Sequence, residues 1–216
     1  MIFCFLMFIF ACKELYGMNI EVHPLEPFLP ENGRILFLGS FPPPRWRWSM
    51  EFFYPNWIND FWRIMGLIYF GDKTYFEVSG EKCFDRGRIV DFCRSRGIAL
   101  FDTACRVRRL RDNADDKFLE IVEGTDVFAL LDRMPGCSVV VTTGGKASEE
   151  LQSYLQGRGI CVGIPNVGGC VEIGGCVDSL VGRPFTWYRM PSSSRAYPMR
   201  LEKKAEYYRA FQNLLT

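Results

Sequence analysis

Residues 34–40 read RILFLGS, a continuous apolar run that stops at a glycine and a serine. Strands buried on both faces of a parallel sheet have this unbroken pattern, because neither of their faces meets water. Three later runs are of the same kind: IALF at 98–101, SVVVTT at 138–143 and FTWYRM at 185–190. The sequence therefore predicts four buried strands.

Helical patterns separate these runs. Residues 59–69 place their apolar side chains at helical spacing, on one face. Strands that alternate with helices predict an α/β fold. We expect a three-layer sandwich with a central four-stranded parallel sheet flanked by helices. The other helical segments are expected at 82–96, within 115–131, from about 146 and at 201–215, and a glycine-rich patch at 161–178 is expected to form a hairpin insertion.

The chain is long enough for one sizeable core, with 216 residues of which 48% are hydrophobic. No repeat or low-complexity linker divides it, so we expect a single domain at 18–216. Residues 1–17 begin with MIFCFLMFIFAC, an apolar run too short to span a bilayer. We expect this extension to come from a start codon assigned too early, with Met18 the true start. A lipoprotein cleavage site that ends at Cys12 is the alternative.

The cysteines give no sign of a metal site. There are nine of them, without a C-x-x-C pair, and His23 is the only histidine. Zinc sites usually need paired cysteines or histidines at short spacing. We therefore expect reduced cysteines, no cofactor, no metal cluster and no membrane attachment, in a cytoplasmic protein that is a monomer.

Basic residues gather where the expected strands end, and parallel strands of this kind bind their ligands at those ends. The clusters are RWRW at 45–48, RVRRLR at 106–111, and Arg195 with Arg200. Because the net charge is only +1, affinity for a polyanion must come from such local clusters. Arginine neutralises phosphates and tryptophan stacks on bases, so the mixture favours nucleic acid, although arginines are also common on ordinary loops.

Two further segments suit phosphate. Residues 192–194 are three serines, which supply hydroxyls and backbone N–H groups. Gly144, Gly145 and Lys146 precede the start of an expected helix, where anions are favoured. Taken alone, the serine run is more often a plain loop.

These segments together resemble the uracil-DNA glycosylase superfamily, and most closely its mismatch-specific uracil and hypoxanthine-DNA glycosylase branch. The resemblance implies a base-excision repair enzyme. Such an enzyme binds DNA with a damaged or mismatched base, flips out a uracil or hypoxanthine, and hydrolyses its N-glycosidic bond. The similarity runs in order from about Arg34 onward. It rests on GSFP at 39–42, FY at 53–54, NDFWRI at 59–64, GIALFD at 97–102, GGKA at 144–147 and MPSSS at 190–194.

The resemblance also implies roles for individual residues. Tyr54 would stack on the flipped base, with Phe41 and Thr143 beside it in the base pocket. Asn59 would be catalytic, since an amide oxygen can orient water, although capping of the adjacent helix is a common role of asparagine. The implied DNA contacts are Ser192, Ser193, Ser194, Arg195 and Lys146.

Two residues depart from the pattern of the strongest uracil glycosylases. Phe41 stands where they have an acid, and Met190 stands where they have a histidine. Asp60 and Asp102 are the nearby carboxylates that could replace the acid, although Asp102 more commonly would end its strand by bonding the next turn. These departures motivate an alternative: a catalytically weak or inactive DNA-binding or damage-sensing module with the same fold. A small-molecule α/β protein of another family is a third hypothesis.

All of the nucleic-acid hypotheses need one geometric condition. Turns from distant parts of the chain must meet around a slot for one base. The residues that must come together are Tyr54, Asn59, Thr143 and Ser192.

Overall fold

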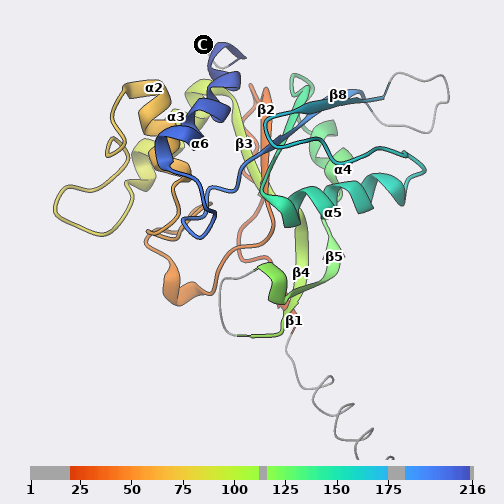
Figure 1. Cartoon of the computed structure of the whole chain (residues 1–216), viewed down its shortest axis with the longest axis horizontal. Helices are drawn as coiled ribbons and strands as arrows, with labels where there is room; N and C mark the ends of the chain where they lie inside the picture. The colour runs from red at the N-terminus through yellow and green to blue at the C-terminus, as the bar shows by residue number, and fades with distance from the viewer. Residues whose placement is uncertain (1–19, 112–115, 175–182, 215–216) are drawn as a thin grey trace, which may run out of the picture.

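A computed structural model of the chain describes residues 20–111, 116–174 and 183–214 (Figure 1). The expected extension at 1–17 and the end of the glycine-rich patch, 175–178, lie outside these ranges. Within them, no helix combines the length and the apolar character needed to cross a membrane.

The central layer is a sheet of five strands in the order β3-β2-β6-β8-β7. β2 pairs in parallel with both β3 and β6, and β6 pairs in parallel with β8. Every residue of β2 and β3 is buried, in agreement with their unbroken apolar runs. The strands are β2 (Ile35–Gly39), β3 (Ile98–Asp102), β6 (Val139–Thr143), β7 (Cys170–Ile173) and β8 (Phe185–Met190).

The prediction of a four-stranded sheet is wrong by one strand. The four predicted strands are mutually parallel, but β7 extends the sheet as an antiparallel edge strand. β7 comes from the glycine-rich patch, and it pairs with β8, whereas the sequence predicts a separate hairpin there. Ile173 is the one fully buried residue of β7, so no continuous apolar run marks this strand in the sequence.

Helices cover both faces of the sheet (Figure 1). On one face, the ring of Phe37 in β2 lies 5.5 Å from that of Phe61 and 5.6 Å from that of Phe211. On the other face, Thr142 of β6 and Ser148 share a hydrogen bond of 2.8 Å. The first face carries α2 (Phe61–Phe70), α3 (Arg86–Arg96), α6 (Leu201–Tyr208) and the 3-10 turn η3 (Arg209–Leu214), and the second carries α4 (Val127–Asp132) and α5 (Gly145–Gln156).

A second, antiparallel sheet continues from the end of β3, in the order β1-β4-β5. The sequence predicts a loop at 102–111, but most of that segment is β4. The buried residues of this sheet and of the loop beside it form a small satellite core, too sparse to give a recognisable apolar pattern. The elements are β1 (Ile20–Val22), β4 (Ala104–Arg109) and β5 (Leu119–Gly124), with the 3-10 turns η1 (Arg45–Arg47) and η2 (Asp116–Phe118) in the neighbouring loops.

Trp187 provides a test of the core. It is fully buried, and its indole N–H donates to Thr142 Oγ1 over 2.9 Å. We expect Trp187→Ala to lower the free energy of unfolding by about 3–5 kcal/mol, because it leaves a cavity in a packed core. Urea denaturation followed by circular dichroism measures this. The control is Trp46→Ala: Trp46 is 65% exposed, so its loss should cost less than about 1 kcal/mol. Equal losses in the two variants would contradict the packing described here.

Candidate functional site

Four strand ends meet at one edge of the central sheet. Gly39 at the end of β2 pairs with Asp102 at the end of β3, and Thr143 of β6 pairs with Met190 of β8. Because these strands are parallel, their carboxyl ends share one edge, which is where α/β sheets bind ligands.

Tyr54 lies at this edge with both its hydroxyl and its ring fixed. The hydroxyl is 3.1 Å from Thr143 Oγ1, which in turn donates to the carbonyl of Leu38. The ring stacks on that of Phe61 at a centroid distance of 3.8 Å. The backbone φ of Tyr54 is 51°, a left-handed conformation that residues other than glycine rarely adopt. Burial, and then the charge of Asp102, raise the pKa of Tyr54 well above its usual range, so its phenol stays neutral.

Asn59 is held in the loop before α2. Its side-chain oxygen accepts a hydrogen bond of 2.9 Å from the N–H of Phe61, the first residue of the helix, although the cap position itself is held by Asp60. Its backbone forms an isolated β-bridge with Ser194. The guanidinium of Arg63 donates to the Asn59 carbonyl over 3.0 Å and is ion-paired with Glu77 at 2.6 Å. The backbone of Asn59 is therefore held by a buried arginine whose charge is paired with a half-buried glutamate.

The serine loop, residues 192–194, packs against the starts of α2 and α5. The carbonyl of Ser193 accepts a hydrogen bond of 2.9 Å from the N–H of Asp60. Ser192 lies against Gly144, where an added Cβ would be 3.2 Å from Ser192 Cβ. The φ of Gly144 is also positive, at 106°. A glycine is therefore needed for the loop to approach the end of β6 this closely.

These contacts bring the required residues to one edge of the sheet. The hydroxyl of Tyr54 is hydrogen-bonded to that of Thr143. Gly144, which follows Thr143, packs on Ser192. The backbone of Asn59 pairs with Ser194 at the end of the same loop. The four residues do not lie on separate surfaces.

A buried carboxylate braces the serine loop. The Asp60 side chain is 9% exposed and binds Lys204 Nζ at 3.2 Å and Arg195 Nε at 2.8 Å. Lys204 is fully buried and also donates to the carbonyl of Ser194 over 2.7 Å. Arg195, which the sequence predicts as a DNA contact, is here an ion-pair partner with 46% of its side chain exposed.

The two remaining predicted residues are also placed. Lys146 lies in the first turn of α5 and forms an ion pair of 2.8 Å with Glu150. Phe41 is 8% exposed and belongs to the satellite core with Ala104 and Val107 of β4. In this structure the Phe41 side chain therefore packs between the loop after β2 and the second sheet.

Many arginines of the predicted basic clusters are ion-paired. Glutamates lie opposite each of the arginines on β4, and Trp46 and Arg47 stack on each other, with 4.6 Å from the guanidinium carbon to the ring. The positive potential at this edge is therefore weaker than the number of arginines indicates. The ion pairs are Arg106–Glu123, Arg108–Glu120, Arg109–Glu21 and Arg45–Glu51.

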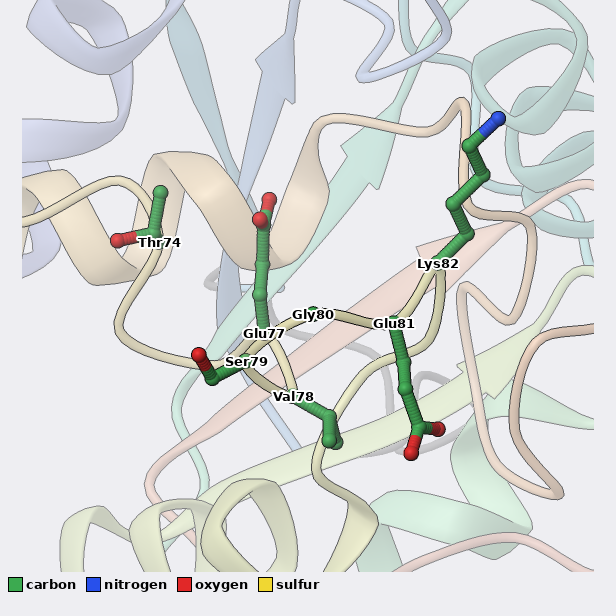
Figure 2. Close-up of a pocket in the computed structure, with 7 residues that line it drawn as sticks. All are labelled: Thr74, Glu77, Val78, Ser79, Gly80, Glu81 and Lys82. Carbon is green, nitrogen blue, oxygen red and sulfur yellow. The ribbon is translucent and has the colours of Figure 1, made fainter.

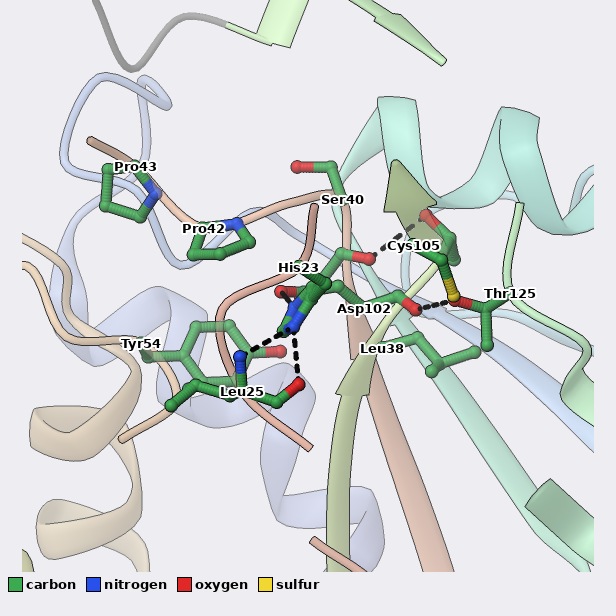
Figure 3. Close-up of polar contacts among 12 residues, drawn as sticks. His23, Leu25, Leu38, Ser40, Pro42, Pro43, Tyr54, Asp102, Cys105 and Thr125 are labelled. Carbon is green, nitrogen blue, oxygen red and sulfur yellow. Dashed lines mark hydrogen bonds and ion pairs between the residues drawn. The ribbon is translucent and has the colours of Figure 1, made fainter. Parts of the chain in front are cut away.

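A pair that the sequence did not indicate also lies at the edge (Figure 3). His23 Nε2 is 2.9 Å from Asp102 Oδ2, and the two side chains are 4% and 11% exposed. The sequence already offers Asp102, at the end of a predicted parallel strand, as a carboxylate near the site. Nothing in the spacing of the sequence connects it with His23, which is 79 residues away.

Two hollows lie on the described surface, one away from the strand ends and one beside the Asp60 brace. One, of about 450 Å³, is lined by the single stretch 74–82, and its polar groups point in different directions (Figure 2). The other, of about 400 Å³, lies beside Arg63, Glu77 and Arg195. Binding sites usually have polar groups that converge. In the described part of the chain, no group of three or more histidines, cysteines or acids could hold a metal ion. The candidate site therefore rests on the contacts at the strand ends.

Comparison with known proteins bears on the fold. No family model and no curated protein matches the chain. Among solved structures, the chain is similar to the solution NMR structure of a candidate uracil DNA glycosylase from Methanosarcina acetivorans. The TM-score is 0.59 and the identity 22%, over 91% of this chain and 99% of that one. The chain therefore has the fold of that protein, and its function has to be argued from the site.

The brace at Asp60 can be tested by removing its buried cation. Lys204→Met leaves the Asp60 carboxylate with Arg195 as its remaining cation, and we expect the free energy of unfolding to fall by about 3–5 kcal/mol. Urea denaturation measures the change. Lys203→Met is the control, because the Lys203–Glu206 pair is exposed. Its loss should lower the free energy of unfolding by less than about 1 kcal/mol. Adding Asp60→Asn to Lys204→Met should recover part of the loss. A double variant without any recovery would contradict the brace.

Proposed function

We propose that the protein is a DNA glycosylase of base-excision repair, which hydrolyses the N-glycosidic bond of a deaminated base, uracil or hypoxanthine, flipped out of DNA. The observation that carries the proposal is the meeting of Tyr54, Thr143, Asn59 and the serine loop at one edge. These residues supply an aromatic ring, an amide and a set of hydroxyls, which suit a base, a water molecule and phosphates. The fold shared with a candidate uracil DNA glycosylase supports the same function.

Tyr54 is the proposed platform for the base. Stacking of a base on an aromatic ring contributes about 1–3 kcal/mol to binding. Less conformational entropy is lost on binding when the ring is already fixed. The Tyr54 ring is fixed by Phe61 behind it and by Thr143 at its hydroxyl. Its raised pKa keeps the phenol uncharged, so it donates a hydrogen bond at every ordinary pH.

Asn59 is the proposed group that orients water. An amide oxygen has two lone pairs, and the N–H of Phe61 uses one of them. The second can accept from a water molecule. Because the bond to Phe61 restrains the amide, that water would be held in one place relative to the sugar carbon it attacks.

The serine loop is the proposed phosphate site. The hydroxyl oxygens of Ser192 and Ser194 each accept a hydrogen bond of 3.2 Å from a backbone N–H two residues later. Each hydroxyl then keeps its own hydrogen to donate to a phosphate oxygen. Contacts of this kind position the backbone of DNA without reading its sequence.

A DNA-binding or damage-sensing module without catalysis is the second candidate. Two observations favour it: Phe41, at the position of the acid, packs in the satellite core, and Met190, at the position of the histidine, is fully buried. Neither position can therefore supply a titrating group. Both candidates bind DNA, but only the glycosylase releases a base.

Base release tests the enzymatic proposal. Purified protein should free the base from a duplex oligonucleotide with one uracil or one hypoxanthine, and alkaline cleavage of the abasic strand measures the rate on a gel. We expect Asn59→Ala to be slower by about 100-fold, as for loss of a group that activates water. Asn56→Ala is the control, since its side chain also accepts a backbone N–H in the same loop, over 3.1 Å, and it should keep the parent rate. Retained DNA binding without release from either lesion would favour the second candidate.

Salt dependence tests DNA binding itself. Because many arginines near the site are ion-paired, we expect only a few phosphate contacts, and log Kd should change with log salt concentration with a slope of about 2–4 in magnitude. Fluorescence anisotropy with a labelled duplex measures the slope. A slope near zero, or no binding at low salt, would exclude both candidates.

A further inference from the structure

The 3-10 turn η1 presents the side chain of Trp46 to solvent. This residue is 65% exposed, and it belongs to the RWRW motif at 45–48, to which the proposed base site gives no role. Single apolar residues are common on protein surfaces, so exposure alone does not indicate a binding site. The rigidity, the position and the charge of the surrounding residues distinguish Trp46 from an ordinary surface residue.

The turn that carries Trp46 is held firmly on both sides. On one side, the indole N–H of Trp48 donates to the carbonyl of Pro43 over 2.7 Å. On the other, the N–H and the hydroxyl of Ser49 both donate to the carbonyl of Pro55, over 2.9 and 2.7 Å. An exposed ring on such a fixed turn loses little conformational entropy when a ligand binds to it.

The same turn is joined to the candidate site. Trp48 forms an isolated β-bridge with Asn56, within the loop that carries both Tyr54 and Asn59. Figure 1 shows η1 as the orange turn beyond the ends of the parallel strands, on the side of the central sheet from which the second sheet also extends. A strand of DNA bound at the candidate site would therefore pass close to Trp46.

Arg47 supplies a positive charge beside the exposed ring. Its guanidinium carbon lies 4.6 Å from the centre of the Trp46 ring. Its neighbour Arg45 is ion-paired with Glu51, whereas no carboxylate in the ranges 20–111, 116–174 and 183–214 pairs with Arg47. The Nε atom of Arg47 is buried and has no hydrogen-bond partner. The charge of Arg47 is therefore left for a ligand.

An exposed ring beside an unpaired guanidinium suits unpaired DNA. The guanidinium of Arg47 covers one face of the indole, and the exposure of Trp46 leaves the other face open to a base. Proteins that bind single-stranded nucleic acid combine aromatic side chains, on which bases stack, with positive charges along the backbone. In a duplex, neighbouring base pairs cover the faces of each base. A fixed ring on the surface therefore meets a base face only where the strand is unpaired.

We propose that Trp46 and Arg47 form a second DNA contact, outside the base pocket, that binds a single-stranded segment. Trp46 stacks on an unpaired base of that segment, and Arg47 binds an adjoining phosphate. This inference goes beyond the proposed function, because it concerns the strand around the lesion and does not require base release. It rests on the DNA binding that both candidate functions share.

The test separates stacking from charge by comparing two single-stranded oligomers with the same number of phosphates. One carries thymine at every position, and the other carries stable abasic residues instead. Fluorescence anisotropy with end-labelled oligomers measures both values of Kd. We expect the parent protein to bind the thymine oligomer about tenfold more tightly than the abasic one, since stacking is the difference between them.

Trp46→Ala should remove most of this preference, and Trp46→Phe, which keeps an aromatic ring, should retain most of it. The control is Val122→Ala: Val122 is 42% exposed on β5, and its loss should leave the preference unchanged. Each preference compares two ligands on one protein, so a smaller folded fraction cancels. Arg47→Gln should lower the salt slope for the abasic oligomer by about 0.7, the value for one phosphate contact on a single strand.

The outcomes distinguish this inference from the proposed function. A preference that is unchanged in Trp46→Ala, or that the parent protein lacks, would overturn the stacking contact, and an unchanged salt slope in Arg47→Gln would overturn the phosphate contact. Base release from a lesion duplex by the same parent protein would leave the proposed function standing. A parent protein that binds neither the oligomers nor the lesion duplex would overturn both.

Discussion

The close approach of the Asp102 carboxylate to the backbone of Gly39 is the constraint on which this end of the molecule depends. A side chain at residue 39 would place its Cβ 2.3 Å from Oδ1. Next to Asp102, Thr103 bonds the carbonyl of Gly39 with both its N–H, at 2.9 Å, and its hydroxyl, at 3.1 Å. These bonds turn the chain from β3 into β4. The second sheet, and the segment that carries His23, are placed by that turn.

The two carboxylates at the edge are bound differently. Asp60 has cations on both oxygens and joins α2, α6 and the serine loop into one unit. Such a saturated carboxylate gives rigidity and a fixed geometry, and it has nothing left for a ligand. Asp102 has one oxygen held by His23 and one directed to the strand edge. Rigidity at the first carboxylate holds the loops around the second in place.

The sequence predicted the parts of the fold that local pattern determines. The four parallel strands bury both faces, so each is visible as an apolar run. Tyr54 was placed beside Thr143 by the resemblance to a known family and by no local pattern. β4 and β7 have few buried residues and gave no such run. Ion pairs are invisible for a different reason: Arg109 is evident in the sequence, but its partner Glu21 lies 88 residues away. The contact of His23 with Asp102 is invisible in the sequence for the same reason. The two residues are 79 positions apart and meet only after the second sheet has formed.

In the proposed glycosylase, a carboxylate near a departing base would raise an electrostatic question that the pairing with histidine answers. The base accumulates negative charge as the glycosidic bond breaks, and an unpaired carboxylate would oppose this. The N–H of His23 lies 2.9 Å from Oδ2 and draws part of the charge of Asp102 away from the slot. The neutral phenol of Tyr54 adds no further negative charge, because burial raises its pKa. A histidine with no free nitrogen, enclosed by aromatic rings, would therefore suit the proposed glycosylase: it would reduce the penalty that a nearby carboxylate places on the loss of the base.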